Sequence, residues 1–132
     1  MIIVPADNTV SRNPLEPVRR CCTQIAGLRI ASISGQKVVS KTISAQPGAS
    51  GTWTDEIAIG PPVESYAMLE ITTAGSTVTL QYRHGAEATW QTYDTYASTG
   101  AYLLYCPVQS FFWRAGVTQA NWSAATTVAI KR

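Results

Sequence analysis

The sequence predicts an all-β protein: an antiparallel β-sandwich or jelly roll of about eight strands with an extended N-terminal arm. Short runs in which apolar residues alternate with polar ones recur along the chain, and Gly and Pro turns separate them. No stretch has the periodicity of a long helix. The composition agrees, because charged residues make up only 14% of the 132 residues and apolar residues 45%. Ordinary soluble domains carry about a quarter of charged residues.

Residues 1–27 form the predicted arm. Pro5, Pro14 and Pro17 interrupt it, and each proline removes a backbone donor and biases the preceding residue toward extended geometry. Only a weak helical pattern covers residues 15–25. The apolar side chains of the arm need a surface, either the chain's own sandwich or a neighbouring subunit, and we favour the neighbour. These side chains are Ile2, Ile3, Val4 and Leu15.

Residues 28–132 form the predicted sandwich domain. Alternation begins around Arg29, a turn is expected at Ser34-Gly35-Gln36, and a strand is expected over Lys37–Ile43. The stretch Gln46–Gly51 contains Pro, Gly and Ser and is the most loop-like part of the chain. The next strand, Trp53–Ile59, has alternating residues that we expect on one face, and the Gly-Pro-Pro sequence that follows ends it.

The clearest strand pattern is in residues 66–83. The runs Tyr66–Thr73 and Thr77–Arg83 flank a short Ala-Gly-Ser turn, and Val78, Leu80 and Tyr82 alternate with polar residues. Alternation of this kind places one face of a strand against a core. We predict that the two runs pair as a central hairpin.

Four further strands are expected in the last third of the chain. They end at turn residues such as Ser98-Thr99-Gly100 and Pro107. In the first of them we expect Trp90 to point inward. The four are Ala88–Tyr93, Ala101–Cys106, Phe111–Thr118 and Thr126–Ile130.

The three cysteines predict reduced thiols. Cys21 and Cys22 are adjacent, and a bridge between neighbours is strained. Cys106 ends an apolar run and is expected to be a small buried hydrophobe. An odd count without a spacing motif does not indicate the disulfide framework of a secreted protein.

No motif predicts catalysis. The single histidine, His84, stands in a polar turn, and no spacing of His, Cys or carboxylates predicts a metal site. No Gly-x-Ser-x-Gly elbow is present. Asp55 and Glu56 are neighbours on a strand, so they point to opposite faces and do not form the opposed pair of a glycosidase. We expect no enzymatic activity, no cofactor and no metal; a phenotype for His84→Ala without loss of stability would support the enzymatic alternative.

Charge is distributed unevenly. Six basic and two acidic residues occur up to residue 41, against four basic and six acidic residues after it. The pair Arg19-Arg20 lacks interleaved aromatic residues, so docking on an acidic protein surface is at least as good an interpretation as nucleic-acid binding, which we do not expect. The opening apolar run is too short for a signal segment or a membrane span, so we expect cytosolic synthesis and no membrane partner.

Aromatic residues exceed what a core of this size needs, with four Trp and six Tyr. Some are expected on the surface, where they anchor protein interfaces or stack on sugar rings. Trp122 is our candidate for a protein contact. The alternative is a sugar-stacking platform made by Trp90, Tyr93, Tyr96 and Trp122.

The basic arm and the Thr-, Ser- and Ala-rich stretch LEITTAGSTVTLQYRHGAEATWQTY at residues 69–93 resemble small virion proteins of tailed bacteriophages. The nearest kind is the jelly-roll capsid cement, or decoration, protein. The resemblance implies a homo-dimer or homo-trimer that is assembled in the host bacterial cytoplasm, binds the outer capsid surface and clamps neighbouring major capsid protein subunits. The alternative is a tail-fibre, receptor-binding or carbohydrate-binding module. The expected partner-binding residues are Ile2, Ile3, Val4, Leu15, Arg19, Arg20 and Trp122.

Overall fold

The computed structural model describes residues 23–26, as backbone, and 37–132. Most of the predicted arm, with its expected contact residues at positions 2–4, 15, 19 and 20, lies outside this part. The described residues are all-β, as predicted, with one short 3₁₀ turn, η1 (Gln119–Asn121). No helix in them is long and apolar enough to cross a membrane. The strands are β1 (Thr23–Ala26), β2 (Val38–Ile43), β3 (Thr52–Trp53), β4 (Ile57–Ile59), β5 (Tyr66–Thr73), β6 (Val78–Arg83), β7 (Gln91–Tyr96), β8 (Gly100–Tyr105), β9 (Phe111–Val117) and β10 (Thr126–Lys131).

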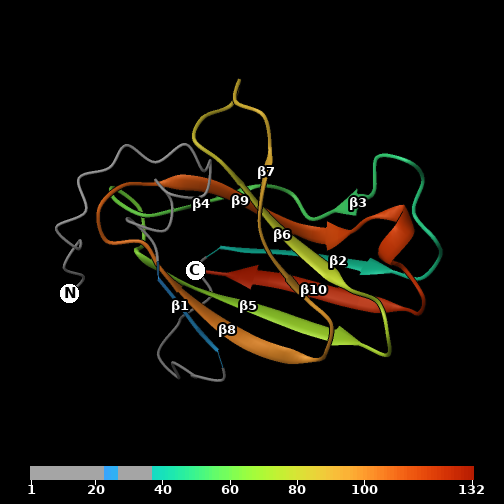
Figure 1. Cartoon of the computed structure of the whole chain (residues 1–132). Helices are drawn as coiled ribbons and strands as arrows, with labels where there is room; N and C mark the ends of the chain where they lie inside the picture. The colour runs from blue at the N-terminus through green and yellow to red at the C-terminus, as the bar shows by residue number, and fades with distance from the viewer. Residues whose placement is uncertain (1–22, 27–36) are drawn as a thin grey trace, which may run out of the picture.

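Two antiparallel sheets face each other (Figure 1). Sheet A has the strand order β1-β8-β5-β10-β2. Sheet B has the order β3-β9-β6-β7, and β4 also pairs with β9. The strand pairing is nested: β2 pairs with β10, β3 and β4 with β9, β5 with β8, and β6 with β7. Such a long hairpin rolled into two sheets is a jelly roll, which confirms the predicted fold class.

The predicted central hairpin is wrong. β5 lies in sheet A and β6 in sheet B, so the Ala-Gly-Ser turn between them connects the two layers. Ser76, fully buried in this connection, donates from its hydroxyl to the carbonyl of Ala124 (2.8 Å) and accepts from the amides of Ser123 and Ala124. Alternation predicts which face of a strand is buried, but it does not predict which strand lies beside it.

The core fills the space between the sheets with side chains from alternate strand positions. Trp113 on β9 is fully buried and packs edge-on against Tyr93 of β7, with ring centroids 5.2 Å apart. Tyr82 of β6 meets Tyr93 and Phe111 in similar edge-to-face contacts. Interdigitated aromatic pairs of this kind add to the stabilisation that burial alone supplies.

The strand expected over Trp53–Ile59 is broken in two. Thr54 is buried; its amide donates to the carbonyl of Ala115 (2.8 Å), and its hydroxyl accepts from the amide of Ala115 (3.2 Å). Pairing with β9 stops after Trp53, opposite Gly116, and resumes at Ile57, opposite Trp113, so three residues stand against two. Trp53 is half-buried, while Ile57 and Ile59 enter the core. The expectation that these residues share one face is therefore wrong.

The end of the predicted arm belongs to the sandwich. Thr23–Ala26 pair with β8 as an edge strand of sheet A, with Thr23 opposite Tyr105 and Ala26 opposite Tyr102. The expectation of reduced thiols is wrong for Cys106, which is disulfide-bonded; Cys21 and Cys22 lie outside the described residues. Cys106 is nonetheless fully buried in the core, as expected.

Candidate functional site

The outer face of sheet B is covered by a stack of tryptophan and arginine side chains. The guanidinium carbon of Arg114 lies 4.3 Å from the ring centroid of Trp53 and 4.4 Å from that of Trp90. The guanidinium carbon of Arg83 lies 4.5 Å from the ring centroid of Trp90. Flat guanidinium groups suit such stacking on aromatic faces. We call these four residues the Trp–Arg stack.

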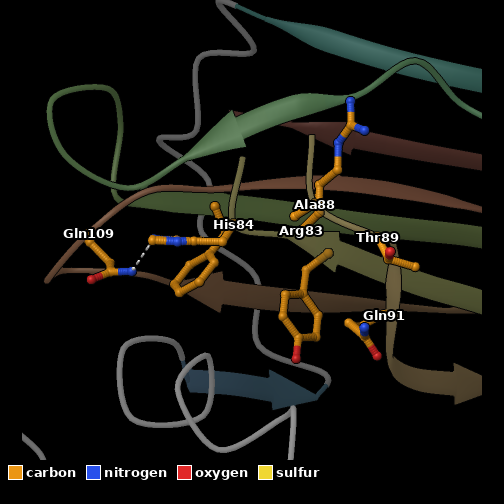
Figure 2. A pocket seen from close by; sticks show the side chains of 8 residues that line it. Arg83, His84, Ala88, Thr89, Gln91 and Gln109 are labelled. Carbon is orange, nitrogen blue, oxygen red and sulfur yellow. Dashed lines mark hydrogen bonds between the residues drawn. The ribbon is translucent and has the colours of Figure 1, made fainter. Parts of the chain in front are cut away.

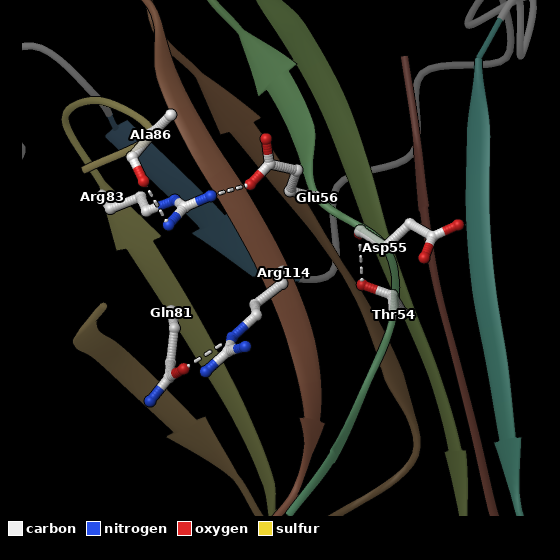
Figure 3. Close-up of polar contacts among 7 residues, drawn as sticks. All are labelled: Thr54, Asp55, Glu56, Gln81, Arg83, Ala86 and Arg114. Atoms are coloured by element: carbon white, nitrogen blue, oxygen red, sulfur yellow. Dashed lines mark hydrogen bonds and ion pairs between the residues drawn. The ribbon is translucent and has the colours of Figure 1, made fainter. Parts of the chain in front are cut away.

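Hydrogen bonds hold the two arginines in place (Figure 3). Arg114 donates from Nε to Oε1 of Gln81 (2.9 Å). Arg83 donates to the carbonyl of Ala86 (2.8 Å) and forms an ion pair with Glu56. Burial, and then the nearby Arg83 charge, lower the pKa of Arg114, but an arginine keeps its proton in proteins. The charges of this face are therefore engaged within the chain.

A glycine makes room for the stack. Gly116 follows Arg114 on the outer side of β9, opposite Trp53 of β3. A Cβ atom at Gly116 would lie 2.0 Å from the carbonyl oxygen of Thr52 and 2.8 Å from the Trp53 ring. Without a side chain there, β3 approaches β9 closely enough for Trp53 to cover Arg114.

The outer face of sheet A is different. It carries two of the three large hydrophobic side chains that are exposed in the described residues, Val38 (48% exposed) and Tyr66 (40%). Tyr66 of β5 stacks on Tyr105 of β8, with ring centroids 4.5 Å apart and planes inclined by 19°. Their sequence neighbours Ala67 and Leu104 are in the core, so the two tyrosines project away from it.

Two more apolar residues occupy this outer face. Met68 and Leu103 are opposite each other on β5 and β8; both are buried, yet they are not part of the core cluster between the sheets. The same face carries an ion pair between Lys131 and Glu70 (2.8 Å). We call the set Val38, Tyr66, Met68, Leu103 and Tyr105 the tyrosine face.

A cleft of about 540 Å³ lies at the end of sheet B where β6 turns into β7 (Figure 2). Its polar groups belong to Tyr82, Arg83, His84, Thr89, Gln91 and Gln109. The imidazole of His84 lies against Phe111 (5.4 Å between centroids) and 3.4 Å from the amide nitrogen of Gln109. The lining residues are Tyr82, Arg83, His84, Ala88, Thr89, Gln91, Gln109 and Phe111. The described residues contain no group of three His, Cys, Asp or Glu side chains that could bind a metal ion.

The expected sugar-stacking platform does not form. Tyr93 and Tyr96 are each only 5% exposed and belong to the core cluster. Trp90 lies in the Trp–Arg stack rather than pointing inward, and β7 begins after it. Trp122 is partly buried against the core, so its role in partner binding stays a prediction.

Sequence reasoning missed the tyrosine face. The signal was present, because Tyr66 and Met68 alternate with the core positions Ala67 and Leu69 on one strand, and an apolar residue on both faces of a strand indicates two covered faces. The second strand, β8, became its neighbour only through the nested pairing.

Comparison with protein-family models, curated proteins and solved structures gives no significant match.

Proposed function

We propose that the protein is a structural virion protein that binds the outer surface of a bacteriophage capsid and stabilises it by clamping neighbouring major capsid protein subunits. One observation carries the proposal: two large apolar side chains of the tyrosine face, Val38 and Tyr66, are exposed on one sheet, while the equivalent face of the other sheet is covered by its own Trp–Arg stack. Exposed apolar patches on otherwise covered domains mark interaction sites.

The chemistry of the tyrosine face fits a protein surface as its partner. Stacked tyrosines are rigid and amphipathic, and such residues dominate the binding energy of protein interfaces. Tyr66 and Val38 lie on strands β5 and β2, not in loops. The face of a sheet is broad, so it suits a broad protein surface as its partner. Many weakly bound copies on one shell would add their contacts through avidity.

Two further features support the proposal. Jelly rolls are common in viral capsid proteins, which is support by analogy of fold alone. The disulfide at Cys106 suits a protein on the exterior of a particle, because disulfides persist on virion surfaces and are rare in the cytosol.

The test is gradient co-sedimentation of the purified protein with phage capsids that lack it. We expect Tyr66→Ser to reduce the bound fraction strongly. Val108→Ser is the matched control, because Val108 is the third large exposed hydrophobic residue (65%) and lies in the loop between β8 and β9. Equal binding by the two variants would contradict the role of the tyrosine face. Failure of the unmodified protein to sediment with any capsid would contradict the proposed function itself.

The cleft supports a second candidate function, that of a carbohydrate-binding module of a tail fibre or receptor-binding protein. Hydrogen-bonding side chains in a cleft that also contains an aromatic ring, here His84, Gln91 and Gln109 with Phe111, suit sugar hydroxyls and the apolar face of a sugar ring. A glycan array would test this, with Gln109→Ala expected to abolish any signal. Thr92→Ala is the control, because Thr92 is exposed on β7 and does not line the cleft.

A further inference from the structure

Arg114 carries a positive charge that none of the groups in contact with it neutralises. Its Nε donates to Oε1 of Gln81 (2.9 Å), and its plane stacks on the rings of Trp53 (4.3 Å) and Trp90 (4.4 Å), which are all neutral partners. Within the described part of the chain it forms no ion pair and no second hydrogen bond. The guanidinium group is therefore fixed in place, but its charge is not balanced.

The nearest charged side chains do not balance it either. Glu56 forms its ion pair with Arg83, so the charges of these two residues offset each other. Burial, and then the positive charge of Arg83, lower the pKa of Arg114, whereas Glu56 raises it by less. Because an arginine keeps its proton in proteins, the charge of Arg114 stays positive and lacks an acidic partner of its own.

Two nitrogen atoms of this guanidinium group, Nη1 and Nη2, are available to a ligand. Neither has a partner among residues 37–132, and Arg114 is partly exposed on the outer side of β9. The N–H donors along such an edge match the two oxygen atoms of a carboxylate. Since the tryptophan rings and Gln81 already fix the side chain, a bound carboxylate would cost little further ordering.

The strand register extends this site into a row of three side chains. Arg114 is opposite Gln81 of β6, and Gln81 is opposite Thr92 of β7; directly opposite residues point to the same side of a sheet. In the described structure, the amide nitrogen of Gln81 and the hydroxyl of the exposed Thr92 also have no partner. The row therefore presents an arginine edge, an amide and a hydroxyl, and its three members include no acid.

This row and the tyrosine face point in opposite directions, because they are on the outer faces of two sheets that pack against each other (Figure 1). One flat surface cannot contact both of them. A protein that clamps neighbouring subunits needs two contact surfaces, and the tyrosine face supplies only one.

We propose that the row formed by Arg114, Gln81 and Thr92 is a carboxylate-binding site, and that it docks on an acidic side chain of a second capsid subunit beside the one that contacts the tyrosine face. The carboxylate accepts from Nη1 and Nη2 of Arg114, the arrangement in which arginine binds carboxylates most strongly. The identity of the partner rests on the proposed function, whereas the carboxylate site itself does not.

Titration of the purified protein with sodium acetate, followed by nuclear magnetic resonance, tests the site. The indole N–H signals of Trp53 and Trp90 should shift together and saturate, whereas sodium chloride at the same ionic strength should leave them in place. Arg114→Lys keeps the charge but lacks the fork, so it should lose the saturable shift. Lys41→Gln is the control, because Lys41 is exposed on β2 of sheet A, and should keep the shift.

Thr92→Val is a milder variant that removes only a hydroxyl, and it should weaken acetate binding by about threefold. The other signals of each spectrum report whether a variant is folded. Equal shifts with chloride, or a saturable shift that Arg114→Lys retains, would overturn the carboxylate site. Unchanged acetate affinity in Thr92→Val would overturn the place of Thr92 in it.

Capsid co-sedimentation at about 0.1 M and 1 M NaCl tests the partner, because salt screens a charged contact and does not weaken an apolar one. Arg114→Gln should bind at least about tenfold more weakly than the unmodified protein at the lower concentration and lose little more at the higher one. Lys41→Gln should bind as the unmodified protein does. Equal losses for the two variants would overturn the capsid contact alone. Absence of binding by the unmodified protein would count against the proposed function, while the acetate titration would still decide the carboxylate site.

Discussion

The outer faces of the two sheets differ in how far their large side chains are covered. On sheet B, Trp53 and Trp90 are covered by Arg114 and Arg83. Arg114 also donates to Gln81, and Arg83 donates to Ala86 and Glu56. On sheet A, Tyr66 and Val38 remain exposed. Both faces carry large side chains, but only one face is closed by groups of its own sheet. The abundance of aromatic residues therefore does not by itself locate a binding surface. The location depends on whether other side chains cover the aromatic rings.

The largest expected loss of stability comes from removing the disulfide of Cys106. Replacing Cys106 with Ser should lower the free energy of unfolding by about 4 kcal/mol, the entropy of closing a loop of about 85 residues together with the burial of a hydroxyl. Urea unfolding followed by tryptophan fluorescence would measure it. The unmodified protein in dithiothreitol should show most of the same loss, and a loss below about 1 kcal/mol would contradict a stabilising bond.

The second-largest loss of stability is expected when Arg114 is removed from the Trp–Arg stack. Arg114→Ala removes two ring contacts and the hydrogen bond to Gln81, and should destabilise the protein by about 2 kcal/mol. Arg114→Lys keeps the charge but loses the flat stacking geometry, so it should recover less than half of this. Lys131→Ala is the control on sheet A, because its ion pair with Glu70 is exposed and is worth about 0.5 kcal/mol or less. Equal losses for the two alanine variants would show that the stack contributes nothing special.

A smaller loss of stability is expected for a substitution on the tyrosine face. Tyr66→Ala removes a ring that is 40% exposed and stacked on Tyr105, so stability should fall by only about 1 kcal/mol. Capsid affinity should fall by about tenfold or more, as for an aromatic interface anchor. The two quantities are measured by urea unfolding and co-sedimentation of the same preparation. A loss of stability larger than that of Arg114→Ala would mean that sheet A depends on this ring for folding.

The smallest effect concerns the edge of the stack. Glu56→Gln removes the ion pair with Arg83 while Arg83 keeps Ala86 and Trp90. The cost should be about 0.5 kcal/mol at low salt and less at 1 M NaCl, where exposed charges are screened. Thermal unfolding at the two salt concentrations would measure it. A cost that is independent of salt would indicate that packing, rather than charge, joins Glu56 to the stack.

A truncation tests whether the N-terminal arm contributes to capsid stabilisation. Deletion of residues 1–20 keeps all three cysteines and β1, so the sandwich should unfold at nearly the same temperature, whereas capsid stabilisation should be lost. Circular dichroism and heat-induced release of DNA from decorated particles would measure the two. A truncated protein that still protects capsids fully would remove the arm from the proposed function.

Much of the secondary structure followed from the sequence alone. The run Tyr66–Thr73 is a strand with the predicted bounds, and β6 starts one residue after the predicted start. Alternation and turn residues suffice here because they report burial of one face and interruption of the chain, which are local properties. Thr54 was missed as a break, because its hydrogen bonds join it to Ala115, far along the chain.

The sites were much less predictable. The sequence identified an excess of aromatic residues, but Trp90 does not point inward as expected, and Tyr93 and Tyr96, which the alternative platform required on the surface, are buried. A strand's alternation has two phases, and a single bulge exchanges them; the register of β6 against β7 shifts between Leu80 and Gln81.

By itself, the sequence determined that this is an all-β protein of short strands with little surface charge, because composition and alternation act residue by residue. Only the tertiary structure decided which strands are neighbours. The order of strands in the two sheets placed Arg114 of β9 beside Gln81 of β6, and Tyr105 of β8 beside Tyr66 of β5, although each pair is more than 30 residues apart in sequence. The Trp–Arg stack and the tyrosine face both depend on those pairings, since contacts between distant segments are set by the packing of the whole chain.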